Sequence, residues 1–140
     1  MKSARHQPLL TVALLAITAL ALPGCKSEPV GGPLALTVEA NDPVKALQHI
    51  NENGQRCWIK SGGRDFSELR LMPELDTRVG RPRLLVLSKK SMQGLPQLVI
   101  EAAGSPVKIE TYGPLASTGA GAQINADIMR WSAGAKDCKA

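Results

Sequence analysis

The stretch LVIEAAGSPVKIETY, residues 98–112, decides the fold that we predict for this chain. It begins with a continuous apolar run at 98–100 and ends with an alternation in which Val107, Ile109 and Thr111 occupy one side of an extended chain. Between them, Gly-Ser-Pro at 104–106 is typical of a turn. Because two strands joined by a short turn pair antiparallel, these residues predict a β-hairpin.

Two further strands are predicted upstream of the hairpin. The continuous apolar run at 84–87 is typical of a central strand. In FSELRLMPEL, residues 66–75, Leu69, Leu71 and Leu75 share one parity, which indicates a half-buried strand. Because Pro73 lacks the N–H of a ladder hydrogen bond, it confines this strand to an edge or marks a bulge.

Helical patterns precede and follow the strands. Asn41-Asp42-Pro43 is a helix-start signal, an apolar stripe at helical spacing follows it, and Gly54 is placed to end the helix. A second helix is predicted at 117–132, with Gly134 as its stop. The apolar face of this second helix is expected to contain Ala122, Ile124, Ile128, Met129 and Trp131.

Two shorter segments complete the predicted topology. The segment RCWIKS, residues 56–61, is interpreted as a strand, and the alternation of Leu34, Leu36 and Val38 suggests a short edge strand. The order is then helix, four or five short antiparallel strands in a meander, and helix. This order predicts an α+β two-layer sandwich with helices on one face of the sheet, in a single small domain over residues 41–140.

The first 24 residues have the pattern of a signal peptide. Lys2 and Arg5 precede a mainly apolar run of 14 residues at 9–22 that consists of Leu, Ala, Ile, Val and Thr. A membrane-spanning helix needs roughly 20 apolar residues, so a retained anchor helix is the less favoured alternative. We therefore expect residues 1–24 to be removed, which leaves a chain of 116 residues.

The end of this segment, Leu22-Pro23-Gly24-Cys25, resembles the lipobox of bacterial lipoprotein precursors. The resemblance implies cleavage after Gly24, a diacylglyceryl group on the sulfur of Cys25, and acylation of the new amino terminus. Two or three acyl chains on one residue make a durable membrane anchor. The alternative is a plain secreted protein, because small residues also precede ordinary cleavage sites.

The resemblance also implies a location. The residue after the lipidated cysteine is Lys26 and not Asp, which by analogy with enteric bacteria favours the outer membrane, facing the periplasm, over the inner membrane. Residues 25–40 are interpreted as the lipidated cysteine followed by a flexible tether rich in Pro, Gly and Ser.

With Cys25 assigned to lipid, Cys57 and Cys138 form an even pair in an oxidising compartment. We therefore expect one disulfide, closing a loop of about 81 residues. A metal site is the competing interpretation, but two cysteines without a nearby His or a CxxC spacing make a poor one. No metal and no cofactor is expected.

Charge and composition limit the partners. Without residues 1–24 the chain keeps 15 Lys and Arg against 12 Asp and Glu, a net charge of +3, which does not favour nucleic-acid binding. One basic cluster flanks the strand predicted at 84–87 and is either a contact for anionic envelope components or a solvated rim. It consists of Arg78, Arg81, Arg83, Lys89 and Lys90.

The sequence supplies no catalytic pattern. His49 is the one histidine that remains after processing, and it is expected to be a partly exposed surface residue. No serine lies in a GxSxG motif, and the glycine-rich stretches match no phosphate-binding loop. We therefore predict a membrane-anchored, non-enzymatic module that binds or scaffolds another envelope component. The alternative is a small-ligand-binding or hydrolase-inhibitor lipoprotein.

Overall fold

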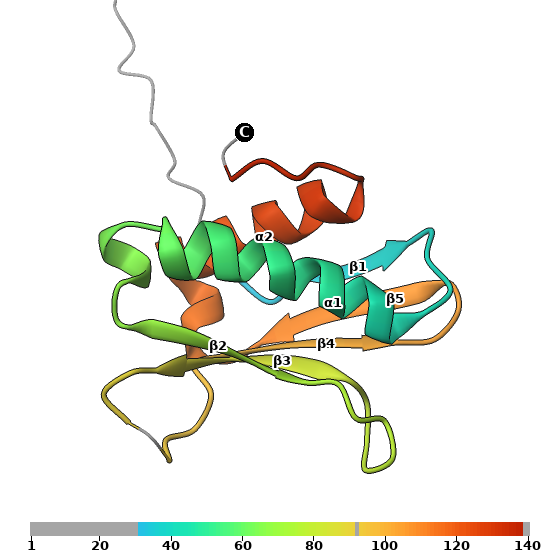
Figure 1. Cartoon of the computed structure of the whole chain (residues 1–140), viewed down its shortest axis with the longest axis horizontal. Coiled ribbons are helices and arrows are strands. Elements are labelled where there is room, and N and C mark those ends of the chain that lie inside the picture. The colour runs from blue at the N-terminus through green and yellow to red at the C-terminus, as the bar shows by residue number, and fades with distance from the viewer. Residues whose placement is uncertain (1–30, 92, 139–140) are drawn as a thin grey trace, which may run out of the picture.

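The structure, a computed structural model, describes residues 31–91 and 93–138, which form one antiparallel sheet with two helices on one face (Figure 1). The strand order is β1-β5-β4-β3-β2. The helices are α1 (Pro43–Gly54) and α2 (Gly119–Ser132), and the strands are β1 (Ala35–Val38), β2 (Leu69–Glu74), β3 (Arg83–Ser88), β4 (Leu98–Ala103) and β5 (Val107–Tyr112). The predicted α+β two-layer sandwich is therefore confirmed.

The predicted hairpin is formed by β4 and β5. The two strands pair antiparallel, with Ile100 opposite Thr111, and Gly104 has the positive φ of 83° that a tight turn favours at glycine. The run at 84–87 lies within β3, a strand with a neighbour on each side, and its four residues are all buried. Even the sheet face opposite the helices has a small apolar cluster, formed by Leu85, Leu87 and Val99.

The two strands that were predicted to lie at sheet edges, β1 and β2, are the two edge strands of the sheet. Strand β2, which contains Pro73, lies at one edge, where a missing N–H does not interrupt the sheet. Strand β1 lies at the other edge and pairs with β5, with Leu36 opposite Ile109. Because β1 belongs to the sheet, the predicted boundary between tether and domain at residue 41 is too late.

Helix α1 begins where the sequence predicts. One carboxylate oxygen of Asp42 accepts hydrogen bonds from the backbone N–H groups of Val44 (3.0 Å) and Lys45 (3.1 Å), and Pro43 occupies the first helical position. These contacts satisfy two of the N–H groups that have no partner inside the first turn.

The predicted strand at 56–61 is wrong. Helix α1 ends at Gly54 as predicted, but the chain does not leave the helical conformation there. Gly54 has right-handed helical angles (φ −62°, ψ −43°), and the chain continues into the π-helical turn η1 (Gln55–Lys60). The apolar positions explain the difference, because Leu47, Ile50, Gly54 and Trp58 continue one helical stripe with spacings of three or four residues. Gly54 serves close packing here: a Cβ atom would lie 2.8 Å from the Trp58 ring and 2.9 Å from Leu71.

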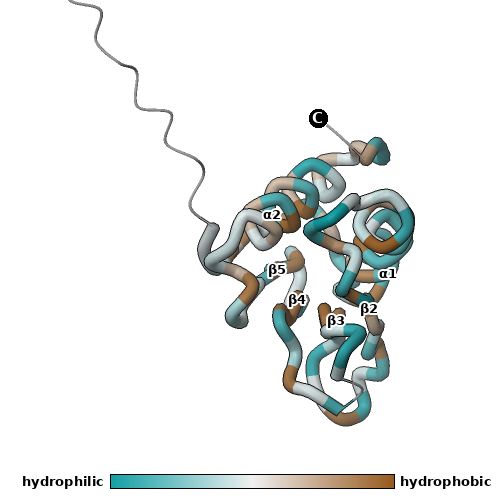
Figure 2. The backbone as a smooth tube through the Cα atoms, turned by 90° about the vertical axis from the view of Figure 1, so that its left-hand side faces the viewer, coloured by the Kyte–Doolittle hydropathy of each residue, from teal (hydrophilic) through white to brown (hydrophobic). Residues whose placement is uncertain are grey.

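The layer between helices and sheet is centred on aromatic side chains. Trp58 packs against Phe66 (ring centroids 6.4 Å apart) and Trp131 (5.0 Å), and all three are buried. Viewed along the layer, hydrophobic segments of the strands and of both helices face this interior (Figure 2). Met129 was expected in the apolar face of α2 but is 46% exposed. The buried face of α2 includes the polar residues Asn125 and Asp127 instead, which an apolar pattern does not detect.

We expect Gly54→Ala to destabilise the protein. The added methyl group must displace the Trp58 ring or Leu71, and overpacking of this kind costs about 1–3 kcal/mol. This cost outweighs the gain of at most about 1 kcal/mol from better helix propensity. Urea unfolding should therefore show a lower free energy of unfolding for the variant.

Gly119→Ala is the matched control. Gly119 also lies in a helix, but a Cβ atom there would meet nothing within 4 Å. The control should leave the free energy of unfolding unchanged or raise it by up to about 1 kcal/mol. If Gly54→Ala were as stable as Gly119→Ala, the close-packing role of Gly54 would be wrong.

Candidate functional site

The chain enters the fold along the first turn of α2. Gly31 lies so close to this turn that a Cβ atom would be 2.4 Å from the carbonyl oxygen of Ala116 and 2.6 Å from that of Thr118. The side-chain amide of Asn125 donates to the carbonyl oxygen of Gly32 at 2.7 Å. The predicted lipidation residue, Cys25, and its motif at 22–25 lie outside the described residues.

A buried polar pair holds Leu34, two residues further along the entering chain than Gly32. The Thr111 hydroxyl accepts from the backbone N–H of Leu34 (2.9 Å) and donates to Oδ1 of Asn125 (2.8 Å). Thr111 and Asn125 are both buried, so their polar atoms depend on these partners. The alternation at 107–111 includes Thr111 but predicts no partner for it, and Asn125 was not predicted to be buried, because isolated polar residues inside predicted elements carry no recognisable pattern.

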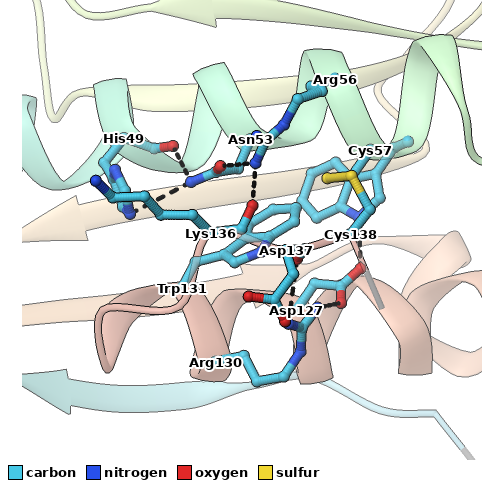
Figure 3. Close-up of a disulfide and its surroundings, with 11 residues drawn as sticks. His49, Asn53, Arg56, Cys57, Asp127, Arg130, Trp131, Lys136, Asp137 and Cys138 are labelled. Carbon is cyan, nitrogen blue, oxygen red and sulfur yellow. Dashed lines mark hydrogen bonds and ion pairs between the residues drawn. A yellow bond between two sulfur atoms is a disulfide. The ribbon is translucent and has the colours of Figure 1, made fainter. Parts of the chain in front are cut away.

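The predicted disulfide between Cys57 and Cys138 is confirmed, with Cα atoms 4.9 Å apart (Figure 3). It joins η1, at the end of α1, to the segment that follows α2. The guanidinium of Arg56 donates to Oδ1 of Asn53 at 2.6 Å and also to the carbonyl oxygen of Lys136. The C-terminal segment is therefore fastened to η1 by a covalent bond and a side-chain contact.

Helix α2 holds the same segment from the other side. The carbonyl oxygen of Asp137 accepts from the indole N–H of Trp131 (3.1 Å) and from Arg130 (3.1 Å), as Figure 3 shows in part. Arg130 also pairs with buried Asp127 at 2.6 Å, and Asp127 accepts from the indole N–H of Trp58 at 2.8 Å. Both carboxylate oxygens of Asp127 have a structural hydrogen-bond partner, so these bonds account for its burial.

His49 lies half-buried at a surface cleft of about 340 Å³. Its Nε2 atom is 3.3 Å from the side-chain nitrogen of Asn53, and the cleft is also lined by Glu52, Arg56 and Lys136. No serine, threonine or cysteine is among these described lining residues. Across residues 31–91 and 93–138, no cluster of three or more His, Cys, Asp or Glu residues could hold a metal ion.

The structure divides the predicted basic cluster between the two ends of β3. Arg78, Arg81 and Arg83 lie at its beginning, and each has a carboxylate partner: Arg78 pairs with Asp76, Arg81 with Glu101 (3.0 Å) and Arg83 with Glu74 (2.7 Å). The hydrogen bond from Arg78 lowers the pKa of Asp76, and the hydrogen bond to Glu74 raises the pKa of Arg83. These three arginines therefore lie in a charge-balanced surface.

The two lysines of the cluster lie at the other end of β3. The ammonium group of Lys89 donates to the carbonyl oxygen of Ser67 at 2.6 Å, and Lys90 lies 3.5 Å from the Glu68 carboxylate. The Lys90–Glu68 pair is exposed on both sides, and such a pair is strongly screened by water. The cations thus lie at both ends of β3, as their positions on either side of the run at 84–87 predict.

Strand β1 leaves an open edge in the described part of the protein. The backbone N–H of Thr111 donates to the carbonyl oxygen of Leu34. Because hydrogen-bonded and non-hydrogen-bonded residues alternate along an antiparallel pair, the backbone N–H and C=O groups of Ala35 and Thr37 point away from β5. A shallow cleft of about 400 Å³ runs along this edge and includes the exposed side chain of Met129. Unpaired strand edges and exposed apolar side chains are typical of surfaces that meet another polypeptide.

The chain was compared with known protein families, with curated proteins and with solved structures, and none of them matches it. Within residues 31–91 and 93–138, no helix combines the length and apolar character needed to cross a membrane. Any functional conclusion therefore rests on the sequence motif and on the geometry described above.

We expect loss of the disulfide to lower the free energy of unfolding by about 2–4 kcal/mol, because the bond closes a long loop in the unfolded chain. Urea unfolding of the Cys57→Ala, Cys138→Ala double variant, compared with the parent protein, measures this effect. A thiol reductant should destabilise the parent protein and leave the double variant unchanged. Equal stability of parent and variant would contradict the structural role of the bond.

Proposed function

We propose that the protein is a lipid-anchored component of the bacterial cell envelope, held in the outer membrane and facing the periplasm. The observation that carries the proposal is the motif Leu22-Pro23-Gly24-Cys25, followed only six positions later by Gly31, where the chain meets α2. In the mature protein, the lipidated first residue would then precede the domain by only a few residues. Asn125 and Thr111 hold the first described residues of that domain. The disulfide between the two remaining cysteines fits an oxidising compartment.

We further propose that the domain is a non-enzymatic binding or scaffolding module for another envelope protein. The open edge of β1 supports a protein partner, because Ala35 and Thr37 offer backbone groups that a second strand can pair with. The neighbouring cleft with exposed Met129 adds apolar area along the same edge.

The alternative is a module that binds a small ligand or inhibits a hydrolase. A small domain fastened by a disulfide suits an inhibitor. Ligand binding has less support, because Trp58, Phe66 and Trp131 fill the layer between helices and sheet. The mainly apolar cleft near this layer, lined by Val38, Ile50 and Trp131 among others, measures only about 130 Å³.

The lipid anchor predicts a defined mature species. Protein extracted from membranes should begin at Cys25 and carry the added mass of two or three acyl chains, as measured by intact mass spectrometry. Cys25→Ser should move the protein from the membrane fraction to the soluble fraction, because it removes the lipid attachment. A species that begins at Cys25 without added acyl mass would rule out lipidation.

The scaffold role predicts a protein neighbour at the open edge of β1. A photo-crosslinking amino acid placed at Thr37 should capture a discrete envelope protein in living cells. The matched control is Gln123, which is also exposed but lies on α2. Recovery of the lipoprotein-sorting machinery alone, or the same products from both positions, would contradict binding at this edge.

A further inference from the structure

One end of the sheet combines the point where the chain enters with an exposed loop. Gly31 lies against Ala116 in the short helix η3 (Pro114–Ser117), and the backbone N–H of Leu115 in η3 donates to the carbonyl oxygen of Gln97 at 2.8 Å. Gln97 in turn donates its backbone N–H to Val86 in β3. The start of the described chain and the connection from β3 to β4 therefore share one end of the domain, the end that faces the viewer in Figure 2.

This end presents an apolar side chain together with cations. Leu95 is 86% exposed, and Lys89 and Lys90 lie in the same connection, directly after β3. Among the described residues, Lys89 has a carbonyl partner and no carboxylate partner, while Lys90 has only the exposed pair with Glu68. Positive charge and an exposed apolar side chain at the same end of a domain are the combination that binds the interface of an anionic membrane.

The opposite end of the sheet provides the comparison. Val79 is 93% exposed in the turn between β2 and β3, so it offers a similar apolar side chain. The arginines around it, however, are each paired with a carboxylate, as described for Arg81 and Glu101. The two ends thus match in apolar exposure and differ in available positive charge.

The length of chain between Cys25 and Gly31 favours one of these ends. Six Cα-to-Cα steps span at most about 22 Å when fully extended. The six-residue strands that separate the two ends are themselves about 20 Å long. The end at which Gly31 enters can therefore lie on the membrane with slack in the chain, whereas the Val79 end would require nearly full extension.

We propose that the domain rests on the membrane through this end, with Leu95 in the lipid interface and Lys89 and Lys90 against anionic phospholipid headgroups. The surface it contacts is the phospholipid leaflet that holds the lipids on Cys25, so the inference rests on the proposed lipid anchor. In this orientation the open edge of β1 and the surface of Arg78, Arg81 and Arg83 remain free for other partners.

Tryptophan substitutions test the orientation in the full lipidated protein. Leu95→Trp and Val79→Trp replace exposed side chains, and the native Trp58 and Trp131 are buried and give a constant background. Each variant is reconstituted in vesicles of phosphatidylethanolamine with about one third phosphatidylglycerol, with or without brominated acyl chains, which quench tryptophan on contact. The emission added by Leu95→Trp should fall at least twofold on bromination, and that added by Val79→Trp should not change. Equal quenching, or stronger quenching at Val79, would overturn the proposal.

Charge variants test the lysines against a matched control. In the Leu95→Trp background, Lys89→Ser with Lys90→Ser should reduce quenching to the level found in vesicles without phosphatidylglycerol. Arg81→Ser with Arg83→Ser removes the same number of cations from the opposite end and should leave quenching unchanged. If replacing both lysines left the quenching unchanged, binding of Lys89 and Lys90 to the headgroups would be contradicted.

Flotation of the unsubstituted protein with the same vesicles separates this inference from the proposed function. A protein that floats while Leu95→Trp stays unquenched has its lipid anchor but a different orientation, so only the inference fails. A protein that does not float and carries no acyl mass lacks the anchor, and both proposals then fail.

Discussion

The packing of Trp58 is the constraint on which the rest of the structure depends. Its indole lies against Phe66 and Trp131 and donates its N–H to the buried carboxylate of Asp127, so one side chain joins the end of α1 to α2. The chain must stay helical through η1 to place this ring, and Gly54 must lack a side chain to make room for it. The position of the neighbouring Cys57, and hence of the disulfide, follows from the same turn.

The two ends of the described chain are held by different means on the same helix layer. Asn125 and Thr111 hold Gly32 and Leu34 by hydrogen bonds. The segment 136–138 is held by the disulfide at Cys138, by the contact of Arg56 with Lys136, and by those of Arg130 and Trp131 with Asp137. In this domain, which has few aromatic residues, hydrogen bonds and a disulfide thus hold the two ends of the described chain in place. The sheet face opposite the helices carries further ion pairs, among them Arg83 with Glu74.

Local patterns predicted much of this fold, and the failures have a common cause. The hairpin, the central strand at 84–87, the edge position of Pro73 and the Asp42 cap all follow from neighbouring residues. The segment at 56–61 was misread because Gly54 resembles a helix stop unless its contact with Trp58 is known. The carboxylate partners of the arginines and the Asn125–Thr111 pair come from distant parts of the chain, which spacing along the sequence does not reveal.

The antiparallel pairing of β1 with β5 also determines how the domain bears mechanical load. Force on Gly31 and Gly32 meets the hydrogen bond from Asn125 to Gly32 and the one between Leu34 and the Thr111 hydroxyl before it reaches Ala35, the first residue of β1. The component of this force along the strand axis is then shared by the hydrogen bonds between β1 and β5. Hydrogen bonds that share a load resist it better than bonds that break one at a time, so these contacts protect the amino-terminal edge of the fold against pulling at Gly31.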